Sequence, residues 1–232
     1  MKLRLRFEKH GAVRYIGHLD VMRYFQKTIR RAEIDVAYTK GFSPHQIMTF
    51  AAPLGVGIES NGEYMDIEVH SMTTCEDIKN RINAASVPGI QIRSVRILPD
   101  TAENAMASVA AAEYTVSFKE GRAPSVDIAG AVEAFLQKES VIITKATKKG
   151  TRDFDLRPGV YVLEWNGQNL HMLLDASSGN NIKPVQVMEA MLAEYDESLP
   201  ENALFITRED VYTRAEAEPD NLISLGDIGH HE

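Results

Sequence analysis

Basic and aromatic side chains near the start of the chain are the residues best suited to bind a charged ligand. Residues 14–20, RYIGHLD, offer a guanidinium, a phenol, an imidazole and a carboxylate. Four basic residues follow at spacings of four, three and one: Arg23, Lys27, Arg30 and Arg31. On a helix these spacings place the side chains along one face, where they can contact successive phosphates of a nucleic acid. The alternative is an ordinary solvated helix face, with His18 and Asp20 serving only at the start of the helix.

A second group of suitable side chains lies in residues 38–45, YTKGFSPH. Lys40, Phe42, Ser43 and His45 provide a cation, a stacking ring, a hydroxyl and an imidazole in one short loop, a combination that suits a phosphate or a base. The segment is not a P-loop, because no Gly-Lys-Ser/Thr follows a glycine-rich run. The alternative is a loop whose Phe42 fills the core and whose His45 makes a local hydrogen bond.

The only basic cluster in the second half of the chain is residues 145–158, KATKKGTRDFDLRP. Lys148, Lys149, Arg152 and Arg157 could extend an anion-binding surface, and a plain basic loop is an equal alternative. The full set of candidate polyanion-binding residues is Arg14, Tyr15, His18, Arg23, Lys27, Arg30, Arg31, Lys40, Phe42, Ser43, His45, Lys148, Lys149, Arg152 and Arg157.

Known catalytic and metal-binding motifs are missing from the sequence. It contains no Gly-x-Ser-x-Gly elbow and no HExxH pair of histidines. The single cysteine, Cys75, excludes an internal disulfide framework, a cysteine-built zinc site and a cysteine-held iron–sulfur cluster. Glu59 and Glu63 are interpreted as exposed turn carboxylates, with acid–base chemistry as the alternative. We therefore expect no cofactor and no metal, assign no catalytic residue, and favour a protein without an enzymatic activity of its own.

The distribution of charge supports a local anion-binding face on an acidic protein. The chain has 232 residues and a formal net charge of -8. Residues 1–45 nevertheless contain ten Lys/Arg against four Asp/Glu, so the remainder carries a net charge of -14. No stretch is long and apolar enough for a membrane span, and the N-terminus lacks a signal-peptide core. We expect no membrane partner and a cytoplasmic location.

Hydrophobic periodicity predicts the elements that must position these residues. In the first half, alternation predicts strands at 2–8, 47–51, 64–69 and 90–98, and a 3.6-residue period predicts helices at 18–33 and 74–85. In the second half, strands are predicted at 113–118, 141–147, 169–174 and 204–212, with an insertion after 147, and helices at 126–138 and 184–195.

The order β-α-β-β-α-β thus occurs twice. It predicts an α+β protein of two tandem ferredoxin-like sandwiches with antiparallel sheets, each with helices on one face and the other face free for a ligand, a partner or the sister domain. The predicted domains are 1–99 and 113–214, joined by a linker at 100–112 and followed by an acidic flexible tail at 215–232.

Several segments together resemble one bacterial family. They are YIGHLD at 15–20, KGFSPH at 40–45, PLGVGIES at 53–60 with GEY at 62–64, and DLRP at 155–158. In this order they are similar to the radical SAM-linked protein family, DUF2344, over residues 1 to 212. Gly17 stands where serine is more usual in that family. The resemblance implies a radical SAM protein as partner, and it supplies no catalytic residue to transfer.

These observations lead to one functional hypothesis and two alternatives. We expect an accessory or substrate-recognition protein that works with a radical SAM enzyme and binds RNA through a basic N-terminal face. One alternative is an RNA-processing enzyme that uses His18 or His45 as general acid or base. The other is a pure protein–protein interaction module. The sequence does not identify the substrate, the partner enzyme or the oligomeric state.

Overall fold

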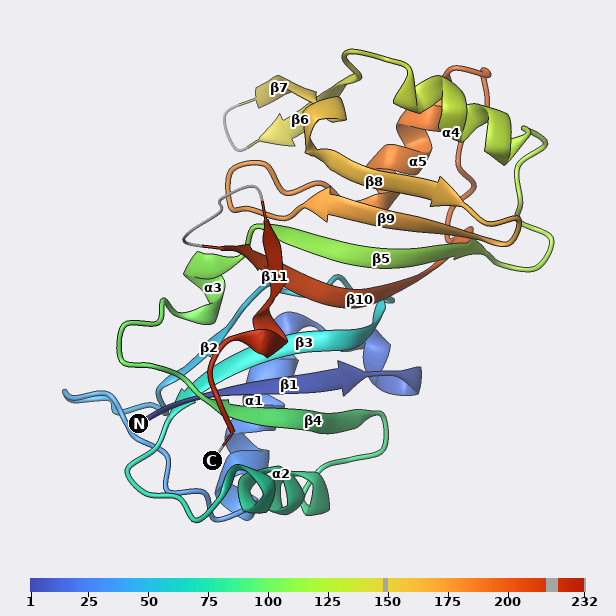
Figure 1. Ribbon diagram of the computed structural model, residues 1–232. Coiled ribbons are helices and arrows are strands. Elements are labelled where there is room, and N and C mark those ends of the chain that lie inside the picture. Colours follow the sequence, from blue (N-terminus) through green and yellow to red (C-terminus); the bar gives the residue numbers. More distant parts are fainter. Residues whose placement is uncertain (148–149, 216–220, 232) are drawn as a thin grey trace. The chain divides into compact units, whose positions relative to one another are not determined.

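The computed structural model describes residues 1–147, 150–215 and 221–231 (Figure 1). Lys148 and Lys149, two of the predicted site residues, lie outside the described residues. Contacts divide the chain into one unit of Met1–Ala110 with Arg208–Glu232 and a second unit of Ala111–Thr207. The sequence predicts a second domain that extends to residue 214, whereas in this division the chain returns to the first unit at Arg208.

The first unit is built around an antiparallel sheet. Its strands are β1 (Lys2–Lys9), β2 (Met48–Phe50), β3 (Glu59–Glu68) and β4 (Ile90–Ile97), and its helices are α1 (His18–Arg31) and α2 (Cys75–Ala84). The strand order is β4-β1-β3, with β2 also paired to β3, and β10 (Leu204–Arg214) follows β3. The β-α-β-β-α-β order predicted for residues 2–98 is confirmed, although β3 begins five residues before the predicted strand.

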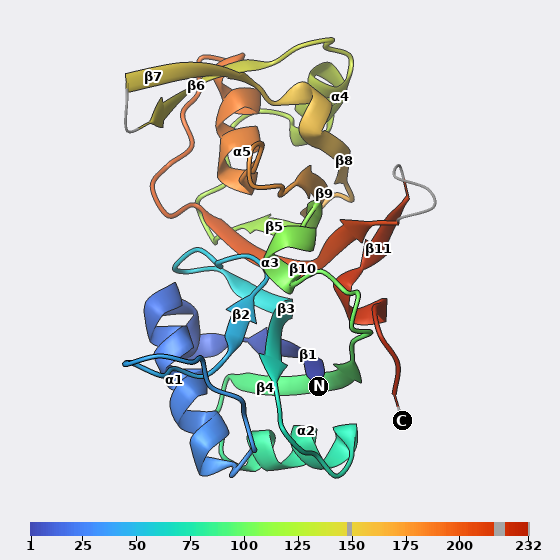
Figure 2. The ribbon, with the colours of Figure 1, turned by 90° about the vertical axis from the view of Figure 1, so that its left-hand side faces the viewer.

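Alternating side chains explain why both helices cover one face of this sheet, as Figure 2 shows. Leu3, Leu5 and Phe7 of β1 are buried in a core that also contains Phe25 and Ile29 of α1. Thr74 caps α2, since its hydroxyl accepts a hydrogen bond from the Asp77 N–H at 3.0 Å. The helices end close to the predicted limits.

The opposite face of this sheet is partly covered by segments of its own unit, whereas the sequence predicted a face free for a ligand, a partner or the sister domain. The covering elements are α3 (Ala105–Ser108), β11 (Leu222–Ser224) and a 3-10 helix at Leu225–Asp227. Leu225 is fully buried in a small core with Tyr64 of β3. The described tail residues 221–231 are therefore structured, where the sequence predicted a flexible tail. The acidic composition of the tail does not reveal this, because the segment is anchored by buried Leu225 and by backbone pairing of β11 with β10 and of His230 with Ile97.

The second unit also contains an antiparallel sheet. Its strand order is β10-β5-β9-β8, with β5 at Ala111–Phe118, β8 at Val160–Trp165 and β9 at Asn169–Asp175, and residues 204–207 are the part of β10 that belongs to this unit. Helices α4 (Ile128–Leu136) and α5 (Pro184–Ala193) pack against each other. The predicted strand at 141–147 exists as β6 (Ile142–Thr147), but it pairs with β7 (Gly150–Asp155) in a separate hairpin. The sheet position expected for it is taken by β8, from the predicted insertion.

The protein is therefore a mixed α+β chain with antiparallel sheets, as the sequence predicted. The predicted linker at 100–112 contains α3 and the first residues of β5. None of the helices among the described residues has the length and apolar character needed to cross a membrane.

Candidate functional site

Helix α1 presents a row of cations to solvent on the side opposite its buried residues. Val21, Phe25 and Ile29 face the core. The exposed members of the row, here called the α1 basic stripe, are Arg23, Lys27, Arg30 and Arg31. Arg23 makes a loose surface pair with Asp20 at 3.4 Å, and in the described part of the chain Lys27, Arg30 and Arg31 form no ion pair. The structure therefore places all four predicted side chains on one exposed face.

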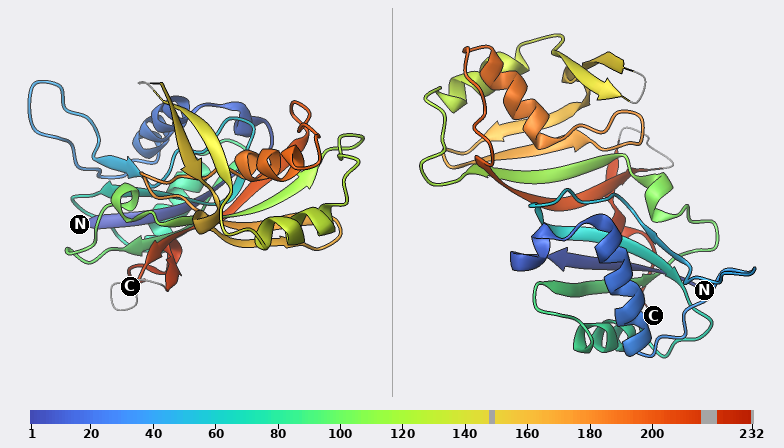
Figure 3. Two further views of the ribbon diagram at one scale, coloured as in Figure 1. Left: turned by 90° about the horizontal axis from the view of Figure 1, so that it is seen from above. Right: turned by 180° about the vertical axis from the view of Figure 1, so that it is seen from behind.

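A projecting loop is held in shape by its own hydrogen bonds. This loop, Thr39–His45, is called the Phe42 loop and extends away from the first unit in light blue in Figure 3. The His45 N–H donates to Thr39 Oγ1 at 3.1 Å, and the Thr39 N–H donates to the His45 carbonyl at 2.9 Å. Lys40, Ser43 and His45 are exposed, and the Phe42 ring is fully exposed. The alternative that Phe42 fills the core is therefore wrong.

The base of the Phe42 loop is attached to the helix that carries the basic stripe. The Gln46 side-chain amide donates to the backbone carbonyl of Gln26 at 3.2 Å. Gln26 directly precedes Lys27 and lies between Arg23 and Arg30 along the helix. An exposed aromatic ring and an exposed row of cations thus come from neighbouring elements of the same unit.

His18 lies at the start of α1, beside a cavity of about 10 Å³ that is also lined by Lys9, Phe50 and Glu63. Its ring meets the edge of Phe50 with 5.4 Å between centroids. Burial lowers the pKa of His18 below its ordinary value of 6.5; Glu63 opposes this shift and Lys9 adds to it. A cavity of that size has room for one water molecule.

A buried ion pair and a buried lysine lie beside this cavity, and no local sequence pattern predicts them. Glu63 forms a two-point pair with Arg208 of β10, with 2.7 Å from Arg208 Nε to Glu63 Oε1. Lys9 donates a hydrogen bond to the Ile16 carbonyl at 3.1 Å. Burial is the largest cause of a lowered pKa for Lys9. The Arg208 charge adds to this lowering and the Glu63 charge opposes it. The prediction that Glu59 and Glu63 are exposed turn carboxylates is therefore wrong: both lie in β3, Glu63 is buried, and the Glu59 side chain is 15% exposed.

Arg14 is held in a local network rather than in the α1 basic stripe. Its guanidinium donates to Glu59 Oε1 at 3.1 Å and to the Tyr15 hydroxyl at 2.8 Å. Burial opposes ionisation of Glu59, but hydrogen bonds from His10, the Gly11 N–H and Arg14 outweigh it and lower the pKa of this carboxyl. Glu59 therefore fixes the segment before α1, and of the two predicted residues only Tyr15 is exposed.

The predicted basic residues of the second unit differ in their surroundings. Arg152 is exposed on β7. Arg157 donates to the carbonyls of Val160 at 3.2 Å and Leu136 at 3.3 Å, so it joins backbone segments of its own unit. Lys145 lies 3.4 Å from the centre of the Phe154 ring and donates to the Asn181 carbonyl at 3.1 Å. Arg157 is thus committed to the fold, whereas Arg152 faces solvent.

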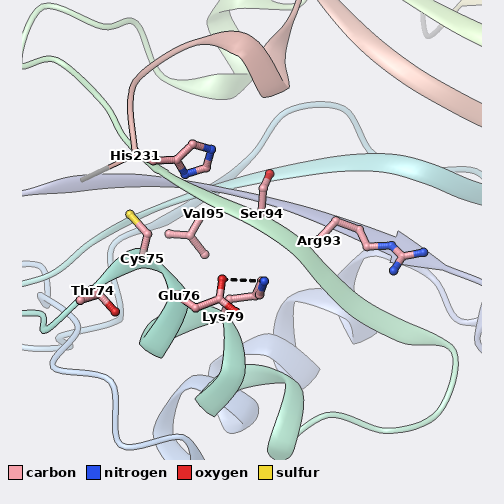
Figure 4. Close-up of a pocket in the computed structure, with 8 residues that line it drawn as sticks. All are labelled: Thr74, Cys75, Glu76, Lys79, Arg93, Ser94, Val95 and His231. Carbon is pink, nitrogen blue, oxygen red and sulfur yellow. Dashed lines mark ion pairs between the residues drawn. The ribbon is translucent and has the colours of Figure 1, made fainter.

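A larger cavity of about 460 Å³ lies between α2 and β4 in the first unit (Figure 4). Cys75, Ser94 and His231 contribute to its walls. Its cations already have carboxylate partners: Lys79 pairs with Glu76 at 2.7 Å and Arg93 with Glu8 at 2.5 Å. Among the described residues no group of His, Cys, Asp and Glu is arranged to hold a metal ion. The α1 basic stripe therefore has a larger excess of positive charge than the lining of this cavity.

Comparison with known proteins places the chain in a family. The model of the family described as "Uncharacterized protein conserved in bacteria (DUF2344)" matches residues 2–184. The chain belongs to this family. The match to DUF2344 covers the α1 basic stripe, the Phe42 loop and most of the second unit.

Other comparisons add little to the description of this DUF2344 protein. No curated protein matches it. A chain of the "Crystal Structure of a Cbf5-Nop10-Gar1 Complex" is similar with 12% identity and a TM-score of 0.43, over 97% of this chain and 53% of the other. This DUF2344 chain therefore spans about half the length of that chain.

Proposed function

We propose that this protein is an RNA-recognition subunit that binds the phosphate backbone through the α1 basic stripe and acts with a radical SAM enzyme in the cytoplasm. One observation carries the proposal: four exposed cations share one helix face on a chain whose net charge is -8. Like charges gathered on one face repel one another, and a bound polyanion would relieve that repulsion.

The partnership with a radical SAM enzyme rests on the resemblance of the motifs in residues 15–20, 40–45, 53–64 and 155–158. A radical SAM enzyme holds its iron–sulfur cluster with three cysteines, and this chain has one. A division of labour, in which one protein supplies the chemistry and this one recognises the substrate, is consistent with that composition.

The architecture proposed for this role is a pair of ferredoxin-like units. In the first unit the strand order β4-β1-β3-β2, with α1 and α2 on one face, is that of a β-α-β-β-α-β sandwich. In the second unit β10-β5-β9-β8, with α4 and α5, has the corresponding order. This topology supports the assignment of each unit by itself, and it implies no function.

The catalytic alternative receives no support from the site. The cavity beside His18 has about 10 Å³, too little for a nucleotide. His45 is engaged with Thr39 in the Phe42 loop. The proposal therefore gives neither histidine a catalytic role.

A salt series tests RNA binding. Binding of a labelled single-stranded oligouridine is measured from about 50 mM salt upward, and log K is expected to fall linearly with log salt. The double variant Lys27→Glu/Arg30→Glu should reduce the slope by about 1.4, since each phosphate contact to a single strand contributes about 0.7. The control is Lys119→Glu/Arg122→Glu, which makes the same charge change at exposed positions of the second unit.

The same measurement contains the outcomes that overturn the proposal. Absence of binding at about 50 mM salt, where phosphate contacts are strongest, rules out RNA recognition. If the salt slope falls equally in the stripe variant and in the control, binding depends on overall charge and not on α1. Capture of a protein with a CxxxCxxC motif that survives nuclease treatment, without RNA binding, would indicate a protein-interaction module.

A further inference from the structure

The Phe42 loop displays its aromatic ring in an unusual setting. Phe42 is fully exposed, although a phenylalanine gains stability by leaving water. It is also not in a loose segment: the backbone and side chain of Thr39 both bond to His45, and the Ile47 N–H donates to the Ala37 carbonyl at 2.8 Å. A ring that a hydrogen-bonded loop holds in solvent is in position to contact something outside its own unit.

We propose that Phe42 stacks on an unpaired nucleobase, so that the protein selects single-stranded over double-stranded RNA. The inference rests on the proposed function and adds the class of RNA. Bases are paired and stacked inside a duplex, and only a base freed from pairing can lie against a protruding ring. The α1 basic stripe would hold the phosphates and the Phe42 loop would hold a base.

The chemistry of the loop favours a nucleic acid over a pocket in a protein. Thr39–His45 contains Lys40 and Ser43 beside the ring and no acidic residue. The loop is attached at Gln26, between cations of α1. A ring flanked by cations and hydroxyls matches a base flanked by phosphates and ribose. A protein pocket for phenylalanine is mainly apolar and would have to accommodate Lys40 next to the ring.

The backbone beside Phe42 shows how the ring is aimed. Gly41 has φ +121, a conformation that residues with a side chain rarely adopt, although a Cβ there would meet nothing within 4 Å. Gly41→Ala should therefore change the direction of the loop without a clash. It provides a second variant that keeps the ring and alters its position.

Fluorescence of a single-stranded RNA that carries 2-aminopurine tests the stacking directly. The wild-type protein should change the 2-aminopurine emission on binding, and Phe42→Ala should remove that change and weaken binding about 5- to 150-fold. Phe42→Trp should retain both effects, whereas Phe42→Leu should not, because leucine has no ring to stack. The control is Tyr195→Ala, which removes an exposed ring from the second unit.

Competition with a duplex of the same sequence completes the test. Wild type should prefer the single strand, and Phe42→Ala and Gly41→Ala should lose that preference while keeping the salt slope set by α1. Salt-dependent binding that is equal for single and double strands, or unaffected by Phe42→Ala, overturns the inference and leaves the proposed function standing. Loss of nuclease-resistant partner capture in Phe42→Ala, with RNA binding unchanged, assigns the ring to a protein pocket and also overturns it. Absence of all RNA binding contradicts both proposals.

Discussion

Glu63 of β3 and Arg208 of β10 form a buried ion pair in the first unit. Glu63 and Arg208 are both nearly inaccessible to solvent, and Arg208 also donates to the Ala52 carbonyl at 2.8 Å. A buried ion pair contributes little net stability over apolar residues, but removal of one partner leaves an uncompensated charge. The pair therefore enforces one arrangement of β3 and β10 within the unit.

Arg208→Met is expected to reduce the free energy of unfolding by about 3–5 kcal/mol, because Glu63 would remain buried without its partner. The double variant Glu63→Gln/Arg208→Met should recover much of that loss. Urea unfolding of wild type, Arg208→Met, Glu63→Gln and the double variant measures both effects. A double variant that is as unstable as the sum of its single changes would show that the two side chains are not coupled.

His18 should make stability depend on pH. Because burial lowers its pKa below 6.5, the folded protein keeps His18 neutral where the unfolded chain takes up a proton. The stability contribution is therefore complete above pH 6.5 and falls as the pH decreases below it. Urea midpoints from pH of about 8 to about 5 should fall more steeply for wild type than for His18→Gln. If the urea midpoints of the two proteins fall in parallel with pH, His18 is not the source of the pH dependence.

Some of these residues could be placed from the sequence and others could not. The α1 basic stripe was predictable because a helical period fixes which side chains share a face. The Glu63–Arg208 pair was not, because its members are 145 positions apart and neither has a local pattern. The exposure of Phe42 was equally hidden, because whether a loop ring is buried depends on contacts made far along the chain.

At the scale of elements, the C-terminal segment is part of the first unit's structure. Tyr64 of β3 donates to Asp210 and also interacts with Ser224 of β11 at 3.1 Å. Burial, with the Asp210 charge and hydrogen bond, raises the pKa of Tyr64, so its hydroxyl remains a donor. The segment thus covers the part of the sheet face around Tyr64 that the sequence predicted to be free.

Leu225→Ala is expected to reduce the free energy of unfolding by about 2–5 kcal/mol, as for other fully buried leucines. Thermal or urea unfolding checks this. Leu222→Ala, at a half-buried position of β11, serves as the control and should cost less. If Leu225→Ala is as stable as wild type, the segment is the flexible tail that the composition suggested.

Elements were easier to predict than their pairing. Strands β1 and β4 follow from alternation, and α1 and α2 from helical periodicity and the Thr74 cap. The β-branched residues of β6 correctly predict a strand. They do not predict that this strand pairs with β7 in a hairpin instead of joining the main sheet. Strand propensity indicates a pleated backbone, and it does not identify the strand with which that backbone pairs.

At the scale of the whole molecule, charge is distributed unevenly along the chain. Residues 1–45 have an excess of six positive charges, against a net charge of -8 for the protein. Part of this excess is used inside the fold, since Lys9 is buried and Arg14 pairs with Glu59, whereas the four cations of the α1 basic stripe are exposed. We therefore propose that RNA contacts α1 and the Phe42 loop and leaves the rest of the surface free.

Lysine acetylation with and without bound oligouridine, read by mass spectrometry, tests that location most directly. Lys27 of α1 and Lys40 of the Phe42 loop are exposed, and so is Lys119 of the second unit. We expect RNA to protect Lys27 and Lys40 from acetylation and to leave Lys119 as reactive as before. Acetylation of Lys27 and Lys40 at the same rate in both samples, or protection of Lys119 alone, would contradict the account.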